Sequence, residues 1–335
     1  MAPNRRRLWL SSLPLLFHFT TAQSFVGGDL NAQAPFSLPP DRFSSLTSNP
    51  SSDNTFTITG YDLSQPASSS DATGKTVKGW SLAVHLTTDV PLTHSADNTI
   101  PKDQFFQATR ISLIPPDGGF AEFNENDWMV CGIVFTGGVN NQDDGEVADN
   151  GSCGNYLGDA CIQAIQVAGV TARNQSAGTV VQGQGAGRCQ DLELPTACVN
   201  DGGFNSHGGG SAFEIVPVTD SETNTGRMSF FAAGSAPVKN KDDTDSIKAA
   251  QDFVWPILLT WTHFGEGSNG TASTVHDSAG WLSCVQAPNT TSKAVDNGDG
   301  DGKKDNGAGE RFLGKGVAFW AVLVGLGVVG FAAVL

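Results

Sequence analysis

Three carboxylates in one short segment, Glu122, Glu125 and Asp127, have the spacing best suited to acid–base chemistry. Hydrolysis of a glycosidic bond needs two carboxyl groups on either side of that bond, about 5–9 Å apart. If the segment is a strand, Glu125 and Asp127 point to the same face, because side chains alternate along a strand. The interpretation we favour is a solvated turn in front of the apolar run that begins at Trp128.

A second acidic group has the ligand chemistry of a calcium site, because its carboxylate oxygens are the hard ligands that calcium prefers. It consists of Asp143, Asp144, Glu146 and Asp149. A plain acidic loop is the favoured interpretation, so we expect no cofactor and keep calcium as the alternative. Zinc is not indicated, because the sequence contains no Cys-x-x-Cys or His-x-x-x-His spacing.

The N-terminus has the pattern of a secretory signal peptide. Three arginines precede an apolar run from Leu8 to Phe19, which closes on small residues that end at Ala22. The run is shorter than the ~20 apolar residues that a membrane-spanning helix needs. We therefore expect residues 1–22 to be removed and Gln23 to become the first residue, with an uncleaved membrane anchor as the alternative.

The C-terminal residues have the pattern of a glycosylphosphatidylinositol (GPI) attachment signal. An uncharged apolar tail, Gly316–Leu335, follows a polar spacer and the three small residues Asn306-Gly307-Ala308. No Lys or Arg follows the tail, whereas a spanning helix usually carries such residues on its cytoplasmic side. We expect Asn306 to receive the anchor and residues 307–335 to be removed; a true membrane span is the alternative.

The chain is acidic, and processing makes it more so. Cleavage at both ends removes five of the 19 Lys and Arg and one of the 34 Asp and Glu, so the net charge becomes 14 − 33 = −19. So much negative charge repels polyanions, which excludes nucleic acid as an expected partner. Solubility at an exposed surface is the simplest reason for the charge.

The sequence has six cysteines, an even number that indicates three disulfides in a secreted chain. They are Cys131, Cys153, Cys161, Cys189, Cys198 and Cys284. Short separations favour local bridges within Cys153/Cys161 and within Cys189/Cys198. That pairing, one of 15 possible ones, leaves Cys131 to bond with Cys284.

Four Asn-x-Ser/Thr sequons indicate a glycoprotein whose glycans lie in exposed loops. The sequons are at Asn150, Asn174, Asn269 and Asn289. All four follow residue 149, so we expect one side of the molecule to be coated by glycans.

Hydrophobic periodicity predicts many short strands separated by turns rich in Gly, Asn and Asp. Alternation is clearest around Phe56 and Ile58 and along Trp80–Leu86. Further strands are expected at Phe105–Ile114, Asp127–Phe135, Ala212–Val218, Met228–Ala233, Phe253–Trp261 and Trp281–Val285. The run that contains Pro256 is expected to be an edge strand or to bend there, because proline has no amide N–H to donate.

Two short helices are expected beside the strands. One covers Ala160–Val167, where Cys161 and Ile165 share a face with Ala168, and the other covers Ser246–Phe253 after Asp245. The predicted fold is all-β, a disulfide-stapled β-sandwich (jelly-roll-like) with one or two short helices. It forms one domain over residues 54–286, after an irregular lead-in at 23–53 and before a polar linker at 287–306.

Five tryptophans lie among the strand hydrophobes, where core packing is the expected role for most of them. They are Trp80, Trp128, Trp255, Trp261 and Trp281. The alternative is that one or two form an exposed platform for a sugar ring, since aromatic faces suit that contact.

The layout resembles GPI-anchored surface glycoproteins of filamentous ascomycete fungi, a group without an assigned activity. The resemblance rests on Trp128-Met129-Val130-Cys131, then on Cys153 and Cys161, and then on Cys189 and Cys198 ahead of a glycine-rich loop. It implies an extracellular protein at the outer face of the plasma membrane or in the cell wall, and it transfers no catalytic residue.

Together these patterns favour a non-enzymatic surface protein with a structural, adhesive or polysaccharide-binding role. The expected partners are the membrane, through the lipid anchor, and cell-wall polysaccharide. A hydrolase or transglycosylase that acts on wall glucan is the alternative, with the acids around Glu125. A module that binds other surface proteins is a third interpretation.

Overall fold

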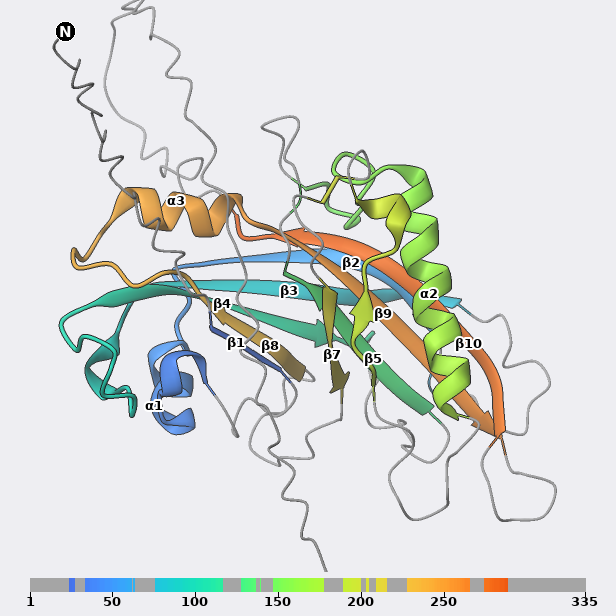
Figure 1. Cartoon of the computed structure of the whole chain (residues 1–335), viewed down its shortest axis with the longest axis horizontal. Coiled ribbons are helices and arrows are strands. Elements are labelled where there is room, and N and C mark those ends of the chain that lie inside the picture. Colours follow the sequence, from blue (N-terminus) through green and yellow to red (C-terminus); the bar gives the residue numbers. More distant parts are fainter. Residues whose placement is uncertain are drawn as a thin grey trace, which may run out of the picture.

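The computed structural model describes residues 24–27, 34–61, 63, 76–116, 128–136, 139, 147–177, 189–199, 203–204, 209–215, 228–265 and 274–288. Within these residues, two antiparallel sheets of five strands each face one another (Figure 1). Three disulfides, described below, cross-link the C-terminal sheet and the segments beside it. The predicted all-β, disulfide-stapled sandwich is therefore confirmed.

The N-terminal sheet has the strand order β1-β8-β4-β3-β2. Its strands are β1 (Ser24–Gly27), β2 (Ser52–Tyr61), β3 (Thr76–Pro91), β4 (Phe105–Ile114) and β8 (Met228–Gly234). The C-terminal sheet has the order β10-β9-β5-β7-β6. Its strands are β5 (Trp128–Phe135), β6 (Leu192–Glu193), β7 (Gly209–Ile215), β9 (Val254–Gly265) and β10 (Thr274–Gln286). The chain therefore crosses between the sheets after β4, after β7 and after β8.

The main core lies between the two sheets and follows the predicted alternation. In β2, Phe56 and Ile58 are buried, whereas Thr55 and Thr57 face solvent. Trp80 of β3 meets Trp261 of β9 edge to face across the core, with ring centroids 6.1 Å apart. Each such buried side chain stabilises the fold by about 1.5–3 kcal/mol relative to an exposed one.

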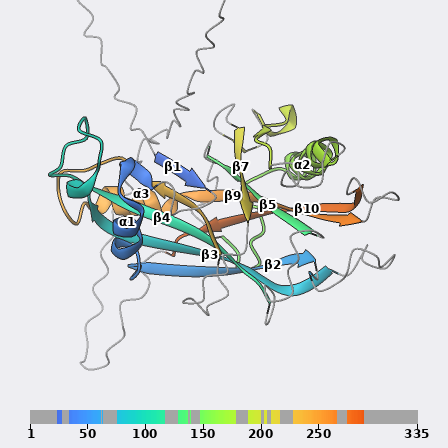
Figure 2. The same cartoon turned by 90° about the horizontal axis from the view of Figure 1, so that it is seen from below.

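β5 is buried along its whole length, because both faces of the C-terminal sheet are covered. One face meets the N-terminal sheet, and helix α2 (Asp159–Ala177) packs on β9 and β10 at the other (Figure 2). Cys161 and Ile165 are buried on the inward side of α2, as predicted. The helix is longer than predicted, and Gly169 explains its close packing, since a Cβ there would lie 2.3 Å from Leu258 Cδ2.

The disulfide connectivity differs from the predicted pairing, although all six cysteines are bonded. The bridges are Cys131–Cys189, Cys153–Cys284 and Cys161–Cys198. The prediction was wrong because closeness in sequence does not put two side chains on the same side of the chain. Cys153 precedes α2 and faces β10. Cys161, in the first turns of α2, faces the 3₁₀ helix η3 (Thr196–Cys198).

Pro256 is not on an edge strand, because β9 lies between β10 and β5. Pro256 pairs with Cys284, whose amide donates instead to the carbonyl oxygen of Gly151, away from β9. In an antiparallel pair, the backbone N–H groups of two directly opposed residues point either both toward the partner strand or both away from it. The Pro256 nitrogen therefore points away from β10, toward the β5 side. The pairing with β5 begins only at Ile257, so the missing N–H breaks no ladder bond.

A short segment closes one open side of the sandwich, where the edge strands β2 and β10 face each other. Thr57 of β2 donates its amide to the carbonyl oxygen of Asp149, and Cys284 of β10 donates to that of Gly151. Gly151 has a φ of +65°, a left-handed conformation that glycine adopts without strain. Edge amides that would otherwise be open to another strand are thereby occupied.

The region expected to be an irregular lead-in contains β1, the 3₁₀ helix η1 (Pro35–Ser37) and helix α1 (Pro40–Leu46). Phe36 and Phe43 belong to a second hydrophobic cluster that includes Phe106 and Ala108 of β4. Ile111 of the same strand faces the main core, so these even-numbered residues lie on the opposite face of the N-terminal sheet. The lead-in therefore covers part of that face.

Candidate functional site

The acids proposed from the sequence lie mostly outside the described residues. This holds for Glu122, Glu125 and Asp127, so the glucan-cleaving alternative stays a prediction. Of the calcium candidates, Asp143, Asp144 and Glu146 are also outside, and Asp149 is an exposed residue in a turn. In the described part of the chain, no three His, Cys, Asp or Glu residues come together as a metal site.

The modification sites are also only partly described. Asn150 is exposed in a turn, where its Oδ1 accepts a hydrogen bond from the Ser152 amide at 3.0 Å. Asn174 belongs to α2 rather than to a loop, while Asn269, Asn289 and Asn306 lie outside the described residues.

Residues 1–22 and 307–335, the two predicted processing signals, are outside the described residues as well. Among the helices that the structure describes, none combines the length and the apolar character needed to cross a membrane.

The tryptophans lie in the core, as predicted for most of them. Trp80, Trp128, Trp255 and Trp261 are buried. Trp281 is partly exposed, but its ring meets those of Trp261 and Tyr61 at 5.2 and 5.4 Å. These five side chains therefore do not form a flat, exposed platform for a sugar ring.

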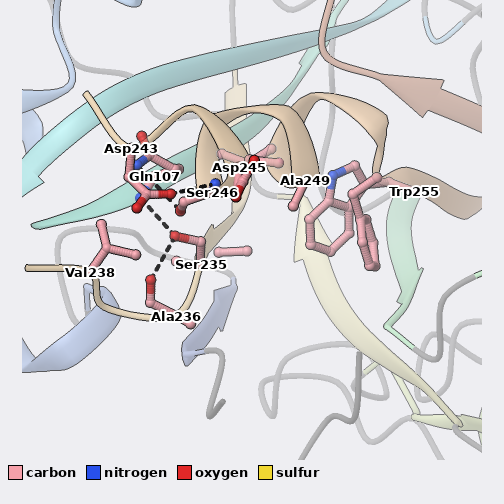
Figure 3. Close-up of a pocket in the computed structure, with 14 residues that line it drawn as sticks. Gln107, Ser235, Ala236, Val238, Asp243, Asp245, Ser246, Ala249 and Trp255 are labelled. Atoms are coloured by element: carbon pink, nitrogen blue, oxygen red, sulfur yellow. Dashed lines mark hydrogen bonds between the residues drawn. The ribbon is translucent and has the colours of Figure 1, made fainter. Parts of the chain in front are cut away.

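A hollow in the described part of the chain lies at the end of the sandwich where β4 and β9 begin and β8 ends. Helix α3 (Thr244–Asp252) covers this end, and a cavity of about 270 Å³ remains beneath it (Figure 3). Its lining comes from α3, from both sheets and from the turn after β8. The lining residues are Gln107, Thr109, Ala233, Gly234, Ser235, Ala236, Val238, Asp243, Asp245, Ser246, Ala249, Ala250, Phe253 and Trp255.

Helix α3 begins slightly earlier than the sequence predicted. Its N-cap is Asp243, whose Oδ1 accepts a hydrogen bond from the Ser246 amide at 2.8 Å. An aspartate at this position satisfies one of the amides that have no partner in the first turn of a helix. Asp245, the expected opening residue, belongs to the first turn. Ala249 and Ala250, further along the helix, border the cavity.

Polar groups gather at one end of the cavity, where Gln107 holds them in place. Gln107 is only 1% exposed. Its Oε1 accepts from the Asp89 amide at 3.0 Å, and its Nε2 donates to Ser246 Oγ at 3.4 Å. Its backbone amide donates to Ser235 Oγ at 2.8 Å. This network, drawn in part as dashed lines in Figure 3, fixes the side chains at the polar end of the cavity.

The opposite end of the cavity is apolar. Phe253 and Trp255 lie together there, with ring centroids 4.3 Å apart. Ala233 and Gly234 of β8 line the wall between the ends, where small side chains leave space open. The two ends together make an amphiphilic cavity suited to binding, because it offers an apolar surface with a few fixed polar groups.

A separate polar cluster lies on the other face of the N-terminal sheet. Arg110 donates hydrogen bonds to Thr47 Oγ1 and Ser229 Oγ, each at 3.1 Å. Burial lowers the pKa of the Arg110 guanidinium from its ordinary value. The cluster ties α1 and its following turn to β4 and β8, so we assign it a structural role.

The cavity could not be found from motifs, because its lining comes from segments far apart in sequence. The one local signal is the run Ala232-Ala233-Gly234-Ser235-Ala236, which places small residues where other strands carry large ones. Comparison with models of protein families, with curated proteins and with solved structures finds no match to this chain. The fold and site thus define the class on their own: a disulfide-bonded β-sandwich with a small amphiphilic cavity.

Proposed function

We propose that this protein is an extracellular glycoprotein, held on the outer face of the plasma membrane by a GPI anchor, with a structural or adhesive role at the cell surface or in the cell wall. Three disulfides support the extracellular assignment, because such bonds persist in oxidising compartments and are rare in the cytosol. The processing signals and the glycosylation sequons predicted from the sequence support the same extracellular location.

The observation that carries the structural role is the Cys153–Cys284 bridge. Cys284 lies two residues before the end of β10, and the chain then enters the linker that leads to Asn306. Tension from the membrane anchor would therefore enter the domain through β10. A covalent bond to Cys153 stops such tension from peeling β10 away from β9. This arrangement suits a protein that bears mechanical load between cell and wall.

The positions of the tryptophan side chains bear on the choice between a structural, an adhesive and a polysaccharide-binding role. Sugar-binding surfaces use exposed aromatic faces, but four of the five tryptophans considered are buried and Trp281 is packed against the core. We therefore favour a structural or adhesive role over polysaccharide binding. The second experiment below measures polysaccharide binding directly.

The first experiment tests whether a GPI anchor holds the protein on the cell surface. The tagged full chain is expressed in a filamentous fungus, and intact cells are treated with a phospholipase that cleaves phosphatidylinositol anchors. We expect treatment to release the protein into the medium, and an Asn306→Gln variant to give less releasable protein. Protein that stays with the membranes after treatment in both cases would refute the anchor.

The second experiment separates the roles. The released protein is incubated with insoluble β-glucan and chitin, and both loss of protein from solution and release of soluble sugar ends are followed. We expect neither loss of protein from solution nor release of sugar. That result leaves the structural or adhesive role, and crosslinking on intact cells would then identify the neighbouring proteins. Binding without sugar release indicates a wall-binding module instead. Sugar release that Glu125→Gln abolishes, while the exposed control Glu193→Gln retains it, establishes the glucan-cleaving alternative.

A further inference from the structure

We propose that the cavity beneath α3 binds a small organic monocation, an apolar body about the size of one aromatic ring that carries a protonated amine. This site is independent of the proposed surface role, since neither the anchor nor wall contact enters the argument. The apolar body lies between Phe253 and Trp255 and the small residues of β8 and α3. The amine lies at the polar end, near the start of α3.

The volume and lining set the size and polarity of the ligand. About 270 Å³ is just below the ~300–1,000 Å³ typical of pockets for drug-sized ligands, so the occupant is small. Elsewhere the same core is filled by large side chains such as Trp80 and Phe231. Here Thr109 and Ala233 of the N-terminal sheet and Ala250 of α3 line the cavity, and the space between them stays open.

The charges that line the cavity select a cation. Asp243 and Asp245 are the only charged residues among the described residues that form its wall. The nearest lysine on the helix, Lys248, is directed to Asp252, with which it forms an ion pair. Asp243 uses Oδ1 as the helix cap, and its Oδ2 makes no hydrogen bond to a described residue.

A second observation points to a ligand independently of these carboxylates. Thr109 lines the cavity and is only 4% exposed, yet its hydroxyl makes no hydrogen bond to any described residue. The Thr109 side chain is buried as a whole, but its hydroxyl is open to the cavity, where a ligand or a water molecule can bond to it. Thr109 lies two residues after Gln107 on the same face of β4, and both line the cavity.

The test measures binding of three probes of similar size by titration calorimetry, with protein purified from a eukaryotic secretory host that expresses the full chain. The probes are phenethylamine, the neutral 2-phenylethanol and the anionic 3-phenylpropanoate. We expect affinity to fall in that order. Added salt should narrow the difference between the cation and the alcohol, because exposed charges are screened.

Two variants locate the binding. Asp245→Asn should weaken phenethylamine binding about two- to fivefold and leave the alcohol unchanged, since an exposed ion pair contributes little more. Its control is Asp159→Asn, an exposed acid in the first turn of α2. Ala250→Leu should fill the space and remove binding of both ligands, while Ala160→Leu, which adds the same group at an exposed position, should not.

Each result has a fixed meaning. Equal affinity for the amine and the alcohol overturns the proposal, as does binding that survives Ala250→Leu in a folded protein. Absence of binding by all three probes also overturns it. If Ala250→Leu does not fold, the comparison of Asp245→Asn with Asp159→Asn decides the question.

Discussion

Removing the Cys153–Cys284 bridge should destabilise the protein more than removing the Cys161–Cys198 bridge. The two bridges join residues 131 and 37 positions apart. The shorter bridge lies inside the longer loop and shortens it to roughly 100 residues, for which the loss of chain entropy corresponds to about 4.7 kcal/mol. The same relation gives about 3.9 kcal/mol for the 37-residue loop. All four cysteines are buried, so the lost packing is similar in the two variants.

The perturbation is the double substitution Cys153→Ala with Cys284→Ala, compared with Cys161→Ala with Cys198→Ala. Urea unfolding followed by tryptophan fluorescence gives the free energy of unfolding for each variant and for the parent. We expect a difference of about 0.8 kcal/mol between the two variants. Peptide mapping of the parent without reduction should recover the bond between Cys153 and Cys284. An equal or smaller loss for the longer bridge would refute the loop argument, and a bond between Cys153 and Cys161 would refute the connectivity.

Three further predictions concern single residues. Gly169→Ala should destabilise the protein by about 1–3 kcal/mol in thermal unfolding, because its Cβ has no space against β9. The matched change Gly158→Ala should have little effect, since nothing lies within 4 Å of that Cβ. Asp243→Ala should remove the cap of α3 and cost about 1 kcal/mol, seen as faster amide exchange in the first turn of the helix. Hydrogen bonds from the side chain and amide of Thr99 lower the pKa of Asp97 from 3.8, so its contribution to stability is present above that value and is lost as the pH falls through the lowered pKa. Thr99→Val should raise the pKa of Asp97 in an NMR titration, and an unchanged pKa would contradict this assignment.

The strands were predictable because burial on one face leaves a period of two in the sequence. Phe56 and Ile58 mark β2 in this way, and β4 begins and ends where the sequence predicted. The length of α2 was harder to predict. Gly169 weakens helix propensity locally, whereas its close contact with Leu258 stabilises the helix through tertiary packing.

The connectivity and the cavity were not predictable for one shared reason: both depend on contacts between segments far apart in sequence. Cys153 reaches Cys284 only because the turn at Gly151 joins β10 at the side of the sandwich. The cavity needs Thr109, Ala233 and Trp255 from three strands, together with α3. A sequence pattern reports which face of an element is buried, but it does not report which element covers that face.

The three bridges lie in the half of the molecule from which the chain leaves toward the linker. Cys131 and Cys284 belong to the C-terminal sheet, and the other four cysteines belong to α2 or to the segments beside it. The N-terminal sheet has no cysteine, so no disulfide holds it to the rest; hydrophobic packing and the hydrogen bond from the Thr57 amide to the Asp149 carbonyl oxygen contribute instead. Tension on the linker would therefore meet a cross-linked layer first. In the anchored arrangement that we propose, the N-terminal sheet, which no disulfide holds, would lie one layer further from the anchor.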